Sequence, residues 1–429
     1  MSQNLINKYF FVLFSIIPIS IIVGPSVSLA NILIIIFSFL IYIFYINEWS
    51  WLKDKKIQLL FVLYIYLIFN SFIALDFSNS FYRNFGFIRF IILFAAFNYF
   101  FLKFENFNKI LIVWSVILIF ITLDVYYESI NGKNILGYGE GDRIFSFFKD
   151  EPIVGGYVNS LYLLSIGFLF EFFDDKKNKI KYIIFLISIF FLVAILMTGE
   201  RSNAIKALLG FIIFYLFIKN FSLKEKLTSA LIIISLFFII FINSDFMRLR
   251  YHKQFTKVHG VFKFQIYTNL YRSGIEVFKK YPYFGTGNKN YGFETCYGPK
   301  KKENDPLIRE ETYRPDLHNE YKFNVLKNDL YLCSSHPHQT YFEFLAEHGF
   351  IGSIVILSIF FKLTFDLLRK ISINRNKLQF ASFIYILIVF IPILPSGAFF
   401  SDNLLTLFFI NFSLMFCANK NSNLFYKNN

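Results

Sequence analysis

The stretch VSLANILIIIFSFLIYIFYI, from Val27 to Ile46, runs for 20 residues without a charged side chain. About 20 apolar residues in a helix span the hydrocarbon core of a bilayer, where every backbone polar group needs an internal partner. The chain as a whole is similarly apolar, because 56% of its 429 residues are hydrophobic and only 17% are charged. Soluble domains are about 25% charged. The sequence therefore predicts an all-α integral membrane protein.

Outward from this stretch, the chain contains about twelve apolar segments that we interpret as transmembrane helices. They are Tyr9–Val23, Val27–Ile46, Ile57–Leu75, Phe87–Leu102, Ile110–Tyr126, Val154–Phe173, Tyr182–Met197, Ala204–Ile218, Leu227–Ile242, Ile351–Leu368, Phe380–Leu394 and Phe399–Cys417. Three parts follow from this division: helices one to nine in residues 1–242, a large periplasmic loop or cap in 243–337, and an interfacial helix with helices ten to twelve in 338–429. We expect the cap to fold, because it has aromatic residues and a helical pattern of apolar ones.

The basic residues indicate the orientation of these helices. With a cytoplasmic N-terminus, every cytoplasmic loop is rich in Lys and Arg and the short outer loops are not, as the positive-inside rule requires. The cytoplasmic residues are Lys53, Lys55, Lys56, Lys103, Lys109, Lys176, Lys177, Lys179, Lys181, Lys219, Lys224, Lys226, Arg369, Lys370, Arg375 and Lys377. The first 30 residues resemble a cleaved secretory signal, but removing them would break this pattern, so we expect them to stay.

The net charge of +14, from 43 basic and 29 acidic residues, is consistent with this topology plus an anionic ligand rather than with nucleic acid. The cap holds 16 basic and 10 acidic residues. All six histidines lie in or just after it: His252, His259, His318, His336, His338 and His348. Such a basic cap suits an anionic, lipid-linked ligand, although a solvated loop would look the same. Cys296 and Cys333 both face the oxidising side, so a disulfide is plausible, but the spacing does not establish it.

The segment HPHQTYFEFLAEHGFIG, from His336 to Gly352, is more specific. It predicts a short interfacial helix from His338 to a glycine cap at Gly349, followed by entry into the membrane at Phe350. Because the unperturbed pKa of histidine is about 6.5, His338 could act as a general base at the membrane surface. A structural histidine at a helix start fits the same pattern.

Two arginines are candidate anion ligands. Arg201 follows Glu200 in TGERSNAIKALLG, a tight outer turn beside the apolar core, and Arg272 should lie on a helix of the cap. A guanidinium makes forked contacts to phosphate oxygens. The alternatives are a snorkelling anchor for Arg201 and a surface charge, or an ion pair with Glu276, for Arg272. The glycines of Gly285-Thr286-Gly287 fit a turn rather than a nucleotide loop, because no strand precedes them.

Four segments together resemble the O-antigen ligase and polymerase superfamily. HPHQTYFEFLAEHGFIG is similar to the family pattern H-x-H-N-x-Y-x-x-x-x-x-E-x-G-x-x-G, with Gln339 in place of Asn. RSGIEVFKKYPYFGTGNKNYG, TGERSNAI and RIFSFFKDEPIVGGY resemble its other motifs, and all four occur in the family's order. The insert between Asn290 and Leu332 departs from the pattern, and its role stays open.

The resemblance implies a GT-C-type membrane glycosyltransferase of the bacterial inner membrane, with its active site facing the periplasm. Its donor would be a glycan on undecaprenyl diphosphate, and no metal or cofactor would take part. Arg201 and Arg272 would bind the diphosphate, and His338 would take the proton of the acceptor hydroxyl during a single, inverting displacement. His336, Glu200 and Tyr341 are implied as supporting substrate-binding residues.

Three functions remain open. A ligase would move a finished glycan onto lipid A-core, and the motif spacing favours this hypothesis. A polymerase would join lipid-linked repeat units by the same chemistry, and transfer to a protein hydroxyl is a related variant. A lipid-glycan flippase is less well supported, because the ionisable groups gather at one membrane face and we find neither repeats nor helices broken at the midplane.

Overall fold

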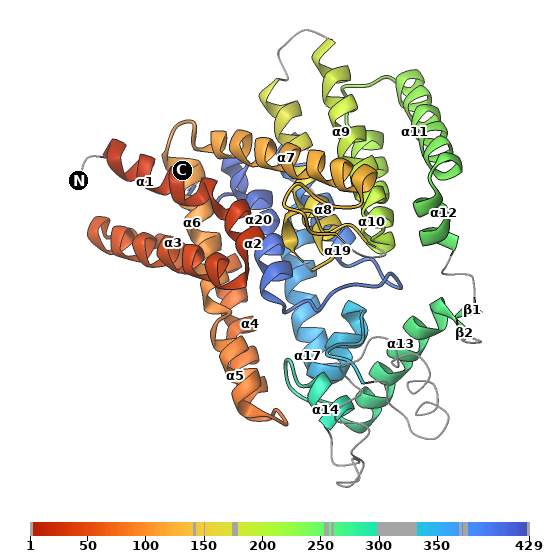
Figure 1. The fold of residues 1–429 in the computed structure, drawn as a ribbon. Coiled ribbons are helices and arrows are strands. Elements are labelled where there is room, and N and C mark those ends of the chain that lie inside the picture. The colour runs from red at the N-terminus through yellow and green to blue at the C-terminus, as the bar shows by residue number, and fades with distance from the viewer. Residues whose placement is uncertain are drawn as a thin grey trace.

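The structure is a computed structural model that describes residues 3–139, 143–149, 151–173, 179–252, 257–258, 261–297, 333–368, 371 and 376–426. It is helical, as predicted, apart from one antiparallel ribbon of two short strands within the described ranges. Figure 1 shows a bundle of long helices with α13, α14 and part of α17 gathered at one end. His259 and His318 lie outside the described residues.

Eight segments of the described chain are long and apolar enough to cross a membrane. The helices that form them are α1 (Gln3–Ser15) with α2 (Ile17–Val23), α3 (Pro25–Ile46), α4 (Lys55–Phe72), α5 (Phe77–Phe85) with α6 (Ile88–Lys103), α7 (Ile110–Asn131), α9 (Lys179–Met197), α11 (Leu223–Asn243) and α17 (Thr340–Phe365). Short 3-10 turns occupy η1 (Ser50–Lys53), η2 (Phe107–Lys109), η3 (Ser146–Phe148) and η4 (Lys420–Ser422). The protein is therefore a multi-pass membrane protein.

The other four predicted segments are also helical but are shorter or more polar. They are α8 (Val154–Phe172), α10 (Arg201–Phe217), α19 (Lys377–Val389) and α20 (Asp402–Cys417). Helix α8 packs against α7, α9, α10 and α19, and α20 packs against α6 and α19. Because other helices surround it, α8 can bury Asn159, Ser160 and Ser165 where a lipid-facing helix would carry apolar residues.

The ends of two predicted helices are wrong. The predicted helix Phe380–Leu394 ends at Val389, and the next begins at Asp402 instead of Phe399, with Ser401 as its N-cap. Pro392 and Pro395 lie in the segment between them, and proline disfavours helix both at its own position and at the residue before it. Residues 390–401 therefore form an irregular loop where we predicted helix.

Phenylalanine fills much of the space between the helices. Phe360 of α17, for example, lies 5.2 Å from Phe408 and 5.9 Å from Phe399, measured between ring centroids. Phe90 of α6 stacks on Phe409 of α20 at 5.1 Å. Offset and edge-on ring pairs at such distances add to the stabilisation from burial alone, so the high Phe content has a direct packing role.

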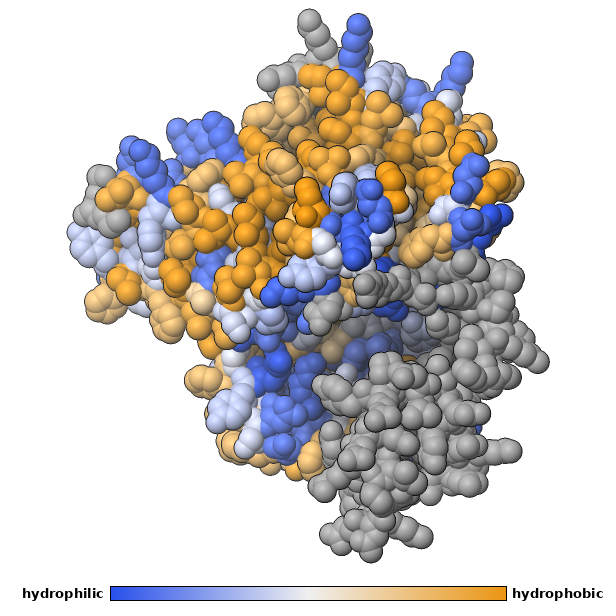
Figure 2. All heavy atoms as spheres, viewed as in Figure 1, coloured by the Kyte–Doolittle hydropathy of each residue, from blue (hydrophilic) through white to orange (hydrophobic). Residues whose placement is uncertain are grey.

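The predicted cap is folded where the structure describes it. It contains α12 (Asp245–His252), the strands β1 (Lys257–Val258) and β2 (Val261–Phe262), α13 (Lys263–Lys280) and α14 (Tyr291–Tyr297). Helix α13 packs against both α14 and α17. Figure 2 shows hydrophobic residues over most of the helical bundle, with hydrophilic residues at several places on its edge and at its lower end. Arg272, on α13, and His338, just before α17, lie at the end of the bundle where α13, α14 and the start of α17 pack together.

Candidate active site

His338 lies just before α17 rather than inside it. The helix begins at Thr340, and the side chain of Gln339 caps it by accepting hydrogen bonds from the backbone of Tyr341 and Phe342 at 2.8 and 3.0 Å. The backbone of His338 is left-handed, with φ at 56°. Non-glycine residues seldom adopt this conformation. The prediction that His338 starts the helix is therefore wrong by two residues, and Gln339 supplies the N-cap.

Three parts of the chain surround His338. The His336 ring lies 4.0 Å from the His338 ring, and the Tyr267 ring of α13 lies 6.4 Å from it, between centroids. The backbone N–H of Ser396 donates to the His338 carbonyl at 2.9 Å, and the hydroxyls of Ser396 and Thr340 lie 3.1 Å apart. The loop 390–401 is thus part of the site. We missed it because its apolar residues looked like a continued helix, although the Pro395-Ser396-Gly397 sequence is a turn signal.

The surroundings of His336 strongly lower its pKa. Burial, with contributions from His338 and Lys289, lowers the pKa of His336 to about 3. Its Nδ1 lies 3.0 Å from the hydroxyl of Ser335. His336 is therefore neutral at physiological pH and adds no positive charge beside His338.

Arg272 lies on the helix that packs beside His338. Gly274 of α13 lets the helix approach closely, since a Cβ there would lie 3.1 Å from Pro337 and 3.2 Å from Phe342. The side chain of Arg272 is exposed and has no ion pair or hydrogen bond with another described residue. Glu276, which we considered as an ion-pair partner of Arg272, instead binds the Lys279 ammonium, with Oε1 and Nζ 2.8 Å apart. The guanidinium of Arg272 is therefore available to a ligand.

Glu200 and Arg201 lie at the N-terminal end of α10. The Glu200 carboxylate accepts from the backbone N–H groups of Gly155 and Gly156, at 2.6 and 3.1 Å, and from the Asn203 amide at 2.6 Å. Those N–H groups belong to the first turn of α8, where a helix favours negative charge. Burial raises the pKa of Glu200, while these hydrogen bonds and the nearby Arg143 oppose the rise. The Glu200 carboxylate thus fixes the turn that carries Arg201.

The four motif segments meet in pairs. TGERSNAI contacts RIFSFFKDEPIVGGY through the Glu200 hydrogen bonds and through the Ile144 N–H, which donates to the Thr198 carbonyl at 3.3 Å. A Cβ on Gly155 would lie 2.6 Å from the Thr198 hydroxyl oxygen, so the glycine allows this close approach. Local sequence gives no hint of this contact, because it joins two helices that are far apart in the chain.

The other two motif segments are hydrogen-bonded backbone to backbone. Thr286 and Gly287 donate to the carbonyls of Ala346 and Glu347, both at 2.9 Å, and Phe350 donates to the Pro282 carbonyl at 2.8 Å. Gly285 and Gly349 have φ values of 72° and 64°, and a Cβ on either would lie 2.3 Å from the backbone of the other segment. These glycines therefore serve backbone packing, in agreement with the predicted turn.

Tyr341 and two buried carboxylates tie α17 to its neighbours. The Tyr341 hydroxyl donates to the Phe390 carbonyl at 2.7 Å. Both carboxylate oxygens of Glu343 lie 3.0 Å from the Phe399 N–H, and Glu347 accepts from the Tyr291 N–H at 3.3 Å. These contacts hold the loop 390–401 and the cap against α17. The sequence did not single out Glu343 or Glu347 as anchors of this kind.

Cys296 and Cys333 form the disulfide that we considered plausible, with their Cα atoms 4.7 Å apart. Next to it, the Thr295 hydroxyl donates to the Ser334 carbonyl at 3.1 Å. The bond thus joins α14 to the segment that enters the site three residues later at His336. The predicted insert lies almost entirely between the two cysteines, so the disulfide closes its base.

The histidines do not form one cluster. His348 is buried inside α17, and its Nδ1 lies 3.4 Å from the Tyr66 hydroxyl of α4. His252 lies in α12. Within the described ranges, no group of three or more His, Cys, Asp or Glu side chains could hold a metal ion. Of the histidines that the structure describes, His336 and His338 are the pair that shares a site.

The site consists of two groups on connected elements. Arg201 and Glu200 begin α10, which packs on α19, and the loop after α19 contacts His338. A multi-pass helical protein that places a histidine beside a helix bearing an exposed arginine is suited to the transfer of a group from an anionic, membrane-borne donor. Residues 186–357 match the family model Wzy_C, described as O-antigen ligase. The members of this family are O-antigen ligases and polymerases, which are glycan-transferring membrane enzymes.

This match confirms the predicted resemblance. It begins in α9 and ends in α17, so it includes Arg201, Arg272, the cap and His338. A search of curated proteins finds no match to the chain.

Proposed function

We propose that this protein is an O-antigen ligase of the GT-C type, which transfers a finished glycan from undecaprenyl diphosphate to lipid A-core at the periplasmic face of the inner membrane. The observation that carries the proposal is the position of His338. It lies outside the capped end of α17 and beside α13, on which the Arg272 guanidinium is exposed. The family match over residues 186–357 supports the same chemistry.

In the proposed reaction, a hydroxyl of the acceptor attacks the anomeric carbon of the donor glycan while His338 accepts the hydroxyl proton. The bond between the anomeric carbon and the diphosphate oxygen breaks, and undecaprenyl diphosphate leaves with the bonding electrons. Because attack and departure occur on opposite faces, the anomeric configuration inverts. His338 later returns its proton to solvent, so the balance is one glycosidic bond formed, one glycosyl phosphate bond broken and one proton released.

Arg201 and Arg272 would stabilise the leaving group. Negative charge grows on the diphosphate as its bond to the sugar breaks, and fixed cations beside it lower the barrier. Arginine suits this role because its fork matches two phosphate oxygens and stays charged. We therefore propose a reaction that needs no metal ion or cofactor.

The supporting residues would act by position. Glu200 holds the turn that carries Arg201, Tyr341 anchors the first turn of α17, and neutral His336 leaves His338 as the proton acceptor. This refines the sequence prediction, in which all three were substrate-binding residues. The described contacts of Glu200 and Tyr341 are with the protein itself.

The experiment is a transfer assay with purified protein in liposomes, supplied with glycan on undecaprenyl diphosphate and with lipid A-core. The wild type should shift the glycan onto lipid A-core, and the product should have the inverted anomeric configuration by NMR. The His338→Ala variant, inserted to the same level, should transfer little. Elongation of the donor without transfer to lipid A-core would mean a polymerase, and translocation without transfer would mean a flippase.

A further inference from the structure

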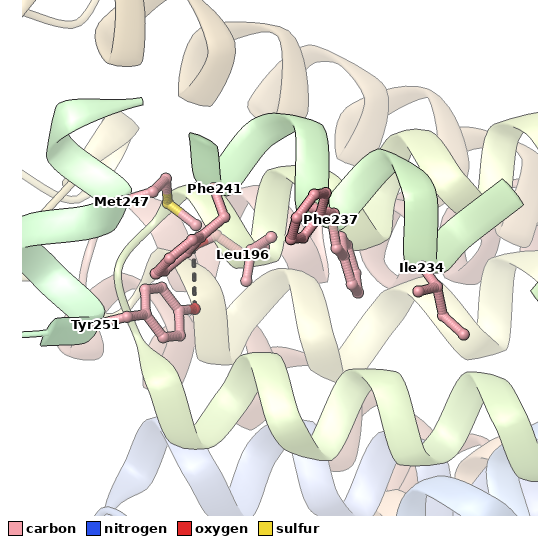
Figure 3. Close-up of a pocket in the computed structure, with 7 residues that line it drawn as sticks. Leu196, Ile234, Phe237, Phe241, Met247 and Tyr251 are labelled. Atoms are coloured by element: carbon pink, nitrogen blue, oxygen red, sulfur yellow. Dashed lines mark hydrogen bonds between the residues drawn. The ribbon is translucent and has the colours of Figure 1, made fainter. Parts of the chain in front are cut away.

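The apolar groove between the end of α9 and helices α11 and α12 is not suited to the charged part of a substrate. Its side chains contain only carbon and sulfur apart from the Tyr251 hydroxyl, which donates to the Leu196 carbonyl at 3.4 Å (Figure 3). A sugar or an anion needs several polar groups that converge on it. Such groups lie instead in the cap, around the loop that leads into α14.

Lys289, in this loop, is held in an unusual backbone conformation. Its φ is 62°, and Asn288 and Asn290 on either side are fully buried. The Asn288 N–H donates to the Asn70 amide oxygen of α4 at 2.8 Å, and the Asn290 amide oxygen accepts from the Asp76 N–H, just before α5, at 2.6 Å. A non-glycine residue keeps a left-handed conformation only where its surroundings fix it, and such positions concentrate at functional sites. The backbone of Lys289 is thus preorganised by two other helices.

The loop that carries Lys289 packs against both sides of the histidine segment. Before Lys289, the Gly287 N–H donates to the Glu347 carbonyl of α17 at 2.9 Å. After it, Gly292 of α14 lies so close to Ser335 that a Cβ on the glycine would be 3.2 Å from the Ser335 Cα. Because Ser335 directly precedes His336, Lys289 lies in the chain between a contact to α17 and a contact to the histidine segment.

The charge of Lys289 acts on the groups of the site. Burial and His338 are the larger causes of the low pKa of His336, and the positive charge of Lys289 adds to them. The same charge interacts with the buried carboxylates of Glu343 and Glu347. The Lys289 side chain is half-buried, and its ammonium makes no hydrogen bond or ion pair with another residue of the described ranges. It is therefore a positioned cation near the histidine pair that is available to a ligand.

We propose that the Lys289 ammonium binds an anionic substituent of the acceptor, a phosphate or a carboxylate close to the hydroxyl that attacks the donor. The inference rests on the proposed function and makes it more specific. In a single displacement, the attacking hydroxyl and the leaving diphosphate lie on opposite sides of the anomeric carbon. Arg201 and Arg272, on α10 and α13, are the proposed ligands of the diphosphate. Lys289 comes from a third element, near His338, which would receive the hydroxyl proton. The group at Lys289 is therefore assigned to the acceptor.

The first test measures transfer to three forms of lipid A-core: unmodified, treated with phosphatase, and methyl-esterified at its carboxylates. Lys289→Met removes the charge and keeps an unbranched side chain, so it adds no backbone strain. Lys279→Met, which removes an exposed lysine of the cap, is the matched control. Lys289→Met should lower kcat/KM for the unmodified acceptor by about 10-fold to 100-fold, as expected for the loss of a charged hydrogen bond. The KM of the donor should not change, and Lys289→Arg should retain most of the activity.

The modified acceptors identify the anion. With the acceptor that lacks it, the wild type should already show the loss, and Lys289→Met should add nothing further. Equal losses with all three acceptors would mean that Lys289 only balances the charge of Glu343 and Glu347. A rise in the KM of the donor would mean a contact to the diphosphate. Either result, or no loss at all, would overturn the inference.

The second test does not depend on transfer. Binding of the same three acceptors to the full-length protein in nanodiscs is measured without donor. The wild type should bind the unmodified acceptor about 10-fold to 100-fold more tightly than the form without the anion, and Lys289→Met should bind both equally weakly. Equal affinity of the wild type for all three would overturn the inference. If the preference is found but no transfer to lipid A-core occurs, the proposed function fails and the anion site stands.

Discussion

Breaking the disulfide between Cys296 and Cys333 should loosen the cap without disturbing the membrane helices. The two cysteines are 37 residues apart. The chain-entropy relation gives about 4 kcal/mol for closing a loop of that length, as an upper bound. The disulfide joins α14 to residues 333–338, so the lost stabilisation should appear as local opening of this region. The equilibrium constant for that opening should rise by up to about 10³-fold. The segment affected leads directly to His338.

The measurement is amide hydrogen exchange on the wild type and on the Cys296→Ser, Cys333→Ser double variant. Faster exchange is expected at Thr286, Gly287 and Tyr291, whose N–H groups bond to α17. The central helices, such as α8, should exchange as before. A reducing agent should reproduce the effect in the wild type and do nothing further to the double variant. Unchanged exchange in the cap after reduction would refute the argument that the disulfide holds the approach to His338.

Three further predictions concern single residues. Arg201→Lys should lower the rate of transfer by about 10-fold to 100-fold while membrane insertion stays normal. The lysine is a point charge and cannot make the forked guanidinium contact to phosphate, a charge-assisted contact worth about 1.5–3 kcal/mol. Full activity in the transfer assay would indicate that Arg201 only anchors the helix end at the membrane surface. Gly349→Ala should lower thermal stability by about 1–3 kcal/mol, since its φ is 64° and the new Cβ would meet the Tyr283 backbone. The matched Gly132→Ala, with φ of 74° but open space around it, should cost less, and equal costs would argue against backbone contact as the cause. The free energy of unfolding of the wild type should fall by up to about 1.4 kcal/mol per pH unit below about pH 6.5. His336 binds a proton in the unfolded chain there, whereas in the folded protein its pKa of about 3 keeps it neutral. The same acid dependence in unfolding curves of His336→Gln would contradict this.

The sequence predicted the helical fold well because a chain segment in the hydrocarbon core of a bilayer has to satisfy its own backbone hydrogen bonds, and a helix does so. Each of the twelve predicted segments overlaps at least one helix, and the break that we expected at Gly349 is present as a non-helical residue inside α17. Prediction failed at helix ends inside the bundle. Residues 390–401 are apolar enough to continue a helix, yet they form a loop. Pro392 and Pro395 disfavour helix there, and Glu343 and His338 accept tertiary hydrogen bonds from the backbone of the loop.

The residues of the candidate site were proposed from the sequence, but the contacts that these residues make could not be predicted from it. His338, Arg201 and Arg272 stood out by their chemical type and position, whereas the role of Glu200 depends on α8, which lies more than 40 residues away in the chain. The spacing of Cys296 and Cys333 likewise permitted a disulfide, but only the packing of α14 against residues 333–335 brings them together. Local patterns cannot encode such distant partners.

The central claim is that His338 serves the transfer of a finished glycan to lipid A-core. Its most direct test is a gel of lipopolysaccharide and lipid-linked glycan from a strain whose only copy of the gene carries His338→Ala. The account predicts bare lipid A-core, with long glycan still attached to the polyprenyl carrier and the protein present in the membrane. A normal lipopolysaccharide ladder would contradict the role of His338, and lipid A-core bearing a single repeat unit would contradict the ligase in favour of a polymerase.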